Sequence, residues 1–154
     1  MTVDGLVIRH AEEGELQRVV ELIHLGAFAV SRENLGPPLP DGYQAAFDEI
    51  RADPNALLMV ADNAGEVVGT FSLVFIPNIS NGGGRVAQIE SVHVAEKWRG
   101  NGIGEAMLRW AIAESNVRGC FRLQLTSNKG RVDAHRFYER LGFAKSHEGM
   151  KLSL

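Results

Sequence analysis

Cysteine is almost absent from this sequence of 154 residues, in which Cys120 is the only one. A single cysteine cannot form a disulfide within the chain, which favours a reducing compartment. No apolar run approaches the ~18 residues that a helix needs to cross a bilayer. Residues 1–15 also lack the charged-then-apolar pattern of a secretory signal. We therefore expect a cytoplasmic protein.

An excess of charge of one sign is lacking as well. The chain has 16 Lys and Arg against 19 Asp and Glu, a formal net charge of −3, with both signs interspersed. Such a balance argues against nucleic acid or an anionic membrane as a partner. The five histidines show no metal-ligand spacing, so we expect no metal. Length and composition fit one folded domain covering residues 1–154.

Apolar periodicity predicts a series of strands and helices along the chain. A tight-turn sequence at residues 62–65 joins two apolar runs into a hairpin, and Asp41 is expected to cap a helix. Gly142 suits the left-handed end of the last helix. The predicted strands cover residues 6–9, 56–61, 67–76, 86–94, 121–126 and 150–154, and the predicted helices cover residues 16–27, 41–51, 103–116 and 132–141.

The order of these elements indicates the fold class. Antiparallel pairing comes first, and a strand–helix–strand unit follows, which crosses over right-handed and pairs in parallel. We therefore predict a mixed α/β or α+β fold with a mostly antiparallel central sheet and about four flanking helices.

The most informative segment is R-G-N-G-I-G at residues 99–104, between a predicted strand and a predicted helix. Glycines let the backbone approach a ligand, and the first amides of a helix are free donors at the positive end of its dipole. Phosphate is the usual ligand of such a loop. The segment lacks the Gly-Lys-Ser/Thr of a Walker loop and the spacing of a dinucleotide fingerprint. A glycine-rich turn without a ligand is the alternative.

Two segments carry a family resemblance. Residues 94–104, V-A-E-K-W-R-G-N-G-I-G, resemble the diphosphate-binding motif of GCN5-related N-acetyltransferases (GNAT), with Glu96 where proline is usual. Asn128, followed by A-H-R-F-Y-E-R-L-G-F at residues 134–143, is similar to that family's second signature. The resemblance implies a single-domain GNAT fold with a V-shaped splay between the fourth and fifth strands. It also implies acetyl-CoA as co-substrate and transfer of its acetyl group to a primary amine of a small molecule.

The resemblance also implies the residues that bind the cofactor. Val92 and Val94 would make main-chain contacts with the pantetheine arm and the acetyl carbonyl, and Asn128 would contact the arm. The diphosphate would lie on the backbone amides of the loop, which is formed by Arg99, Gly100, Asn101, Gly102, Ile103 and Gly104.

Glu90 and Tyr138 are the residues expected to move protons. Strand alternation puts Glu90 on a face with Val86, Val92 and Val94, where apolar neighbours would raise the carboxyl pKa and suit a general base. The family resemblance makes Tyr138 the acid that protonates the leaving thiolate. The alternatives are a solvated carboxylate at a strand end and a tyrosine that only packs.

Other polar residues receive weaker assignments. Alternation puts His93 on the face opposite Glu90, in a structural role, and Cys120 is expected to be a small buried residue. The segment around Arg131, His135 and Arg136 is similar to aminoalkylphosphonate N-acetyltransferases. These cations would either meet a phosphonate or lie solvated on a helix face.

Substrate choice is expected to rest with the irregular segments at residues 31–43 and 78–85, which carry no readable code. Aminoalkylphosphonates, polyamines and other small amines therefore stay open as acceptors, and a protein lysine or N-terminal amine is less favoured. A non-catalytic acyl-CoA-binding regulatory module is the rival reading. The acidic charge balance disfavours a DNA-binding regulator. Analogy with the family implies a homodimer.

Overall fold

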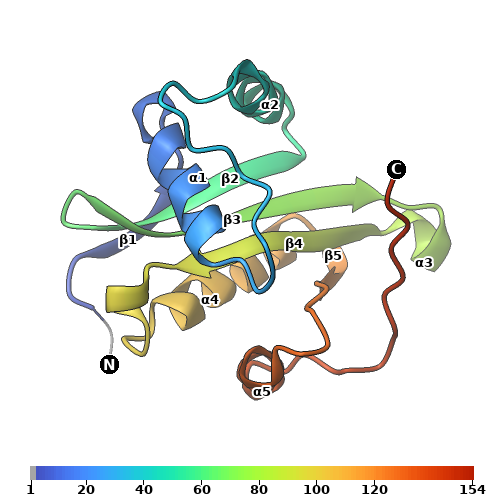
Figure 1. Cartoon of the computed structure of the whole chain (residues 1–154). Coiled ribbons are helices and arrows are strands. Elements are labelled where there is room, and N and C mark those ends of the chain that lie inside the picture. Colours follow the sequence, from blue (N-terminus) through green and yellow to red (C-terminus); the bar gives the residue numbers. More distant parts are fainter. Residues whose placement is uncertain (1–2) are drawn as a thin grey trace.

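The computed structural model describes residues 3–154, which form one five-stranded sheet with helices on both faces (Figure 1). The strands lie in chain order, β1 to β5. The first three pairings are antiparallel and β4 pairs with β5 in parallel, which confirms the predicted mixed sheet. The strands are β1 (Leu6–His10), β2 (Ala56–Asn63), β3 (Glu66–Pro77), β4 (Arg85–Val94) and β5 (Cys120–Gln124).

The predicted hairpin is confirmed between β2 and β3. Ala64 and Gly65 turn the chain with φ values of 52° and 90°, the left-handed conformation that two-residue hairpin turns need. The Gly65 amide donates to Asp62 Oδ1 over 2.7 Å and closes the turn. The sequence D-N-A-G therefore sets the register of β2 and β3.

Helices α1 and α2 cover one face of the sheet and α4 covers the other (Figure 1). Asp41 is the first residue of α2, but Pro40 occupies the cap position and no side chain caps that end, so the predicted cap is wrong. The helices are α1 (Leu16–Leu25), α2 (Asp41–Ala52), the short α3 (Ser80–Gly83), α4 (Ile103–Val117) and α5 (Val132–Arg140), with 3₁₀ turns η1 (Glu13–Glu15) and η2 (Glu96–Trp98). Within residues 3–154 none of these helices combines the length and apolarity of a membrane span.

The prediction of a sixth strand at residues 150–154 is wrong. The segment alternates apolar and polar residues, but it pairs with no strand, and its apolar side chains are exposed to solvent. Met150 is 97% exposed and Leu152 86% exposed. A strand needs a partner for its backbone groups, and the C-terminal segment is an irregular coil without one (Figure 1).

The main core lies between the sheet and α4. Phe71, Leu73 and Phe75 of β3 are buried there against Met107 and Leu108 of α4. On the other face, Val19 and Leu22 of α1 pack on Val60. Both faces of the sheet are therefore apolar, which is why the central strands read as continuous apolar runs.

Strands β4 and β5 separate halfway along β4. They pair from Arg85 to Gln88 on β4, and β5 ends at Gln124 while β4 continues to Val94. This leaves residues 89–94 without a partner on the β5 side and confirms the predicted splay between the fourth and fifth strands. We call the space between these two strand ends the splay.

A β-bulge interrupts β4 inside the splay. Thr70 of β3 pairs with His93, but Ser72 pairs with Glu90, so the β4 side has one residue more. The backbone accommodates the extra residue at Ser91, whose φ is 52°. The bulge reverses the alternation of side chains, so Glu90 and His93 share a face. The predictions that His93 opposes Glu90, and that Glu90 shares a face with Val92 and Val94, are therefore wrong.

Candidate active site

The glycine loop follows β4 and leads into α4. Gly100 and Gly102 have φ values of 79° and 80°, and Gly102 is the residue before the first turn of α4. The Asn101 side chain donates to the carbonyls of Trp98 and Arg99 over 3.1 and 3.2 Å, which holds the loop in shape. The first amides of α4 face outward without helical acceptors and carry the positive end of the dipole. This is the geometry that anion sites at helix N-termini have.

The loop lies beside the splay. A methyl group at Gly104 would lie 3.4 Å from Phe137 Cζ and 3.9 Å from Val94 Cγ2. The missing side chain therefore leaves a space bordered by β4, α4 and α5. A ligand that enters the splay with its anionic part on the loop would pass this position.

The bulge supplies the main-chain groups that such a ligand needs. Ser91 and Val92 together oppose the single residue Phe71, so the ladder cannot satisfy all of their amides and carbonyls. The Val92 and Val94 side chains pack toward the α4 core. Their backbone is left to line the splay, which fits the main-chain role predicted for them.

Glu90 lies in an exposed, polar setting, so the predicted apolar neighbourhood is wrong. Gln88 Nε2 donates to Glu90 Oε1 over 2.8 Å, and Gln124 Nε2 donates to Gln88 Oε1 over 2.7 Å. This chain of bonds crosses from β5 to β4 and fixes the carboxylate at the point where the two strands part. A carboxylate held in this way can accept a proton from an amine that reaches the splay from the α1 face.

Tyr138 approaches from the α4 face. It packs among Phe137 and Phe143, with ring centroids 5.3 and 5.8 Å from its own. Burial raises the pKa of the Tyr138 phenol, against a smaller opposing effect of the Arg131 charge, so the hydroxyl is protonated at neutral pH. No side chain within residues 3–154 hydrogen-bonds this hydroxyl. A hydroxyl that is protonated and has no such bond can serve as a proton donor.

His93 lies on the same face of the sheet as Glu90, where strand alternation did not predict it. Its imidazole lies directly against Gly26 at the end of α1, where any side chain at residue 26 would collide with Nδ1. Burial, followed by the charges of Arg131 and Arg99, lowers its pKa to about 4, so the ring is neutral at pH 7. It also lines a cavity of about 290 Å³ under the α1–α2 connection, whose other lining residues are Ile23, Ala27, Val30, Ser31, Arg32 and Glu33.

The turn between β5 and α5 is built around Asn128. Asn128 Oδ1 accepts from the Gly130 amide over 2.9 Å, and the Asn128 carbonyl accepts from the Arg131 amide over 3.0 Å. His135 Nε2 bonds the same carbonyl over 2.9 Å. Asn128 and His135 therefore shape the turn, while Arg136 lies 69% exposed and pairs with Asp133 over 3.6 Å.

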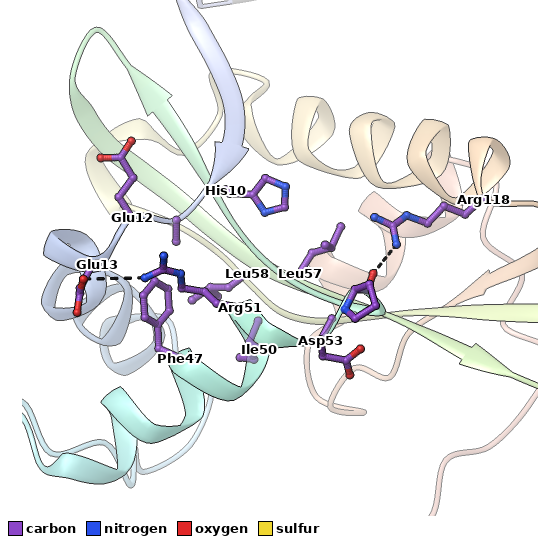
Figure 2. A pocket seen from close by; sticks show the side chains of 13 residues that line it. His10, Glu12, Glu13, Phe47, Ile50, Arg51, Asp53, Leu57, Leu58 and Arg118 are labelled. Atoms are coloured by element: carbon purple, nitrogen blue, oxygen red, sulfur yellow. Dashed lines mark hydrogen bonds and ion pairs between the residues drawn. The ribbon is translucent and has the colours of Figure 1, made fainter.

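The larger cavity, of about 690 Å³, lies elsewhere (Figure 2). Phe47 and Ile50 of α2, with Leu57 and Leu58 of β2, form its apolar wall, and Arg118 donates to the Pro54 carbonyl over 2.7 Å. None of the predicted site residues lines it. Cys120, which starts β5, is half-buried, and burial raises the pKa of its thiol, so it suits packing rather than nucleophilic chemistry.

A sheet that opens beside a glycine loop at a helix N-terminus defines an α/β protein of the acyl-coenzyme A transferase class. The comparison with known sequences gives the family: the sequence model described as the Acetyltransferase (GNAT) family matches residues 16–143. The chain therefore belongs to the GNAT family and is an acyl-CoA-dependent N-acetyltransferase.

Characterised relatives lie within the same family. Glucosamine 6-phosphate N-acetyltransferase of Trypanosoma brucei brucei is 31% identical over 97% of this chain and 96% of its own length. Aminoalkylphosphonate N-acetyltransferase of Salmonella typhimurium is 37% identical over 68% of this chain and 70% of its own length. A crystal structure described as a transcriptional regulator from Bacillus halodurans C-125 has a TM-score of 0.93 and 42% identity, over 97% of this chain and 99% of that one.

Proposed function

We propose that the protein, as one domain covering residues 1–154, transfers an acetyl group from acetyl-CoA directly to a primary amine of a small molecule. The observation that carries this proposal is the splay, which opens beside the glycine loop with Glu90 on one face and Tyr138 on the other. Direct transfer in a ternary complex needs a base near the amine that attacks the acetyl carbon and an acid near the thiolate that leaves it.

In this proposal the cofactor lies along the edge of β4. The amides of residues 99–104 hold the diphosphate, because they are free donors at the positive end of α4. Backbone groups of Val92 and Val94 pair with the pantetheine arm, and an amide at the bulge donates to the thioester oxygen, which gains charge during attack. The Asn128 amide nitrogen adds a contact to the arm.

Three proton transfers complete the reaction. An alkylammonium group has a pKa of about 10.4, so it must lose a proton before its nitrogen attacks the acetyl carbon. Glu90 takes this proton, directly or through a water molecule. As the carbon–sulfur bond breaks, Tyr138, which its raised pKa keeps protonated, donates its proton to the coenzyme A thiolate. The nitrogen, which carries two protons after the attack, releases one of them through solvent to the Tyr138 phenolate, and Glu90 returns its proton to solvent.

A small-molecule acceptor is supported by the relatives. The two curated relatives act, by their names, on glucosamine 6-phosphate and on aminoalkylphosphonates, which are small amines. Polyamines and protein amines are the alternatives, together with a non-catalytic acyl-CoA-binding module. The similar structure described as a transcriptional regulator gives that last alternative its weight.

Release of free thiol from acetyl-CoA in the presence of a panel of amines tests the proposal. The panel contains glucosamine 6-phosphate, 2-aminoethylphosphonate, polyamines, aminoglycosides and a peptide with a free N-terminus. We expect turnover with at least one small amine. Tight binding of acetyl-CoA without turnover on any amine would favour the non-catalytic module.

Glu90→Gln isolates the proposed base. We expect kcat to fall by about 10² to 10⁴ while affinity for acetyl-CoA stays unchanged, because the amide keeps the shape but cannot take the proton. Glu49→Gln, on the exposed face of α2, is the control and should change neither quantity. Equal loss of turnover and of acetyl-CoA affinity in Glu90→Gln would remove its role as base.

Assembly and location complete the proposal. The exposed apolar side chains of Met150, Leu152 and Leu154 support a homodimer in which this segment finds a partner, which sedimentation analysis can test. The lone cysteine supports a cytoplasmic location.

A further inference from the structure

Arginines without acidic partners gather around the splay, although the chain as a whole is acidic. Nine pairs join cations to acids within residues 3–154, and none includes Arg32, Arg99 or Arg131. Arg32 lines the cavity beside His93. Arg99 belongs to the glycine loop, and its Nε donates to the Val94 carbonyl over 3.3 Å. Only Arg131 has no role in the geometry described so far.

Arg131 lies near Tyr138, the proposed acid, and near His93, which lines the smaller cavity. It is half-buried, immediately before the first turn of α5, and Tyr138 follows it on that helix after two turns, on the same side. Its charge acts on both Tyr138 and His93, which come from opposite faces of the sheet. The Arg131 charge is therefore within electrostatic reach of side chains on both faces of the splay.

The surroundings of Arg131 belong to the acceptor side of the site. The next residue upstream, Gly130, touches the α1–α2 connection, since a methyl group there would lie 2.7 Å from Phe28 Cζ. That connection also carries Arg32 and Glu33 into the 290 Å³ cavity with His93. The proposed function already assigns the cofactor's diphosphate to the amides at the start of α4. The nearest acid on α5, Asp133, is paired with Arg136.

We propose that Arg131 is the specificity-determining residue of the acceptor site, where its guanidinium binds a phosphate or phosphonate group carried a few bonds from the reacting amine. The inference rests on the proposed function. Guanidinium binds phosphoryl oxygens in a bidentate, charge-assisted way that an ammonium does not reproduce. Arg32 lines the cavity beside His93 and adds positive charge there, next to the carboxylate of Glu33, while the His93 ring is neutral.

Paired acceptors test the assignment with acetyl-CoA at saturation. The pairs are 2-aminoethylphosphonate with ethanolamine, and glucosamine 6-phosphate with glucosamine. For the wild type we expect kcat/KM at least 10-fold higher with the phosphorylated member of a pair. Arg131→Met should raise KM for that member at least 10-fold and leave the neutral member nearly unchanged, and Arg131→Lys should recover only part of the loss. Arg136→Met, on the outer side of the same helix, should change neither.

Binding separates this inference from the proposed function. Calorimetric titration of 2-aminoethylphosphonate onto the protein saturated with coenzyme A should give a measurable Kd in the wild type and a Kd at least 10-fold weaker in Arg131→Met. That result without turnover would refute the enzymatic proposal and leave the subsite standing. The assignment is overturned if Arg131→Met raises KM for acetyl-CoA, if it affects both members of a pair equally, or if the wild type binds the phosphorylated and neutral amines alike. A thermal melt of each variant identifies losses caused by misfolding.

Discussion

Replacing Gly104 by alanine should stabilise the free protein and weaken its binding of acetyl-CoA. Gly104 is the second residue of α4, and alanine is favoured over glycine in a helix by about 0.5 to 1 kcal/mol. The added methyl group meets only Phe137 and Val94, at 3.4 and 3.9 Å, which are ordinary contacts. For a chain of this length the gain corresponds to a rise in Tm of about 1 to 4 °C.

The same methyl group fills the space that the cofactor needs. It projects between β4 and α5, where we place the part of coenzyme A that joins the diphosphate to the arm. Displacing the ligand there should weaken binding at least 10-fold, which corresponds to about 1.4 kcal/mol. Stability and affinity therefore change in opposite directions, which general damage to the fold cannot produce.

Gly42→Ala is a matched control. Gly42 is the second residue of α2, and a methyl group there has no neighbour within 4 Å. It should give a similar gain in stability without any change in affinity. Differential scanning calorimetry and titration calorimetry with acetyl-CoA measure the two quantities. If Gly104→Ala binds acetyl-CoA as tightly as the wild type, the cofactor does not lie where we place it.

Two further predictions concern stability. The pKa of about 4 for His93 lies below its ordinary 6.5, so unfolding takes up a proton, and the stability that depends on the neutral ring is lost as pH falls from about 6.5 to 4. Urea unfolding across that range should show that the free energy of unfolding depends less steeply on pH in His93→Gln than in the wild type. The exposed His147→Gln should keep the slope of the wild type. Leu73 is fully buried in the main core, so Leu73→Ala should lower the free energy of unfolding by about 2 to 5 kcal/mol, and a loss under 1 kcal/mol by the same method would contradict the core as described.

Much of the fold and of the cofactor site follows from local sequence. The apolar runs of β2 to β4 and the D-N-A-G turn have short-range causes, namely burial on both sheet faces and left-handed turn residues. The glycine loop is equally local, because residues 99–104 supply both the free amides and the glycines that expose them. Local patterns could therefore predict the strand order, the crossover helix and an anion site at its start.

The acceptor side of the site depends on tertiary structure. The bulge at Ser91 arises from the pairing of β4 with β3, and no periodicity in β4 reveals it, so alternation put His93 on the wrong face and gave Glu90 the wrong neighbours. The tail at residues 150–154 has a strand pattern, but pairing needs a neighbour that the folded chain does not offer. The position of Arg131 depends on where α5 begins relative to a splay formed by β4 and β5, two strands that the whole of α4 separates in sequence. A ladder register and a convergence of distant segments are properties of the assembled sheet, which is why only the structure decided them.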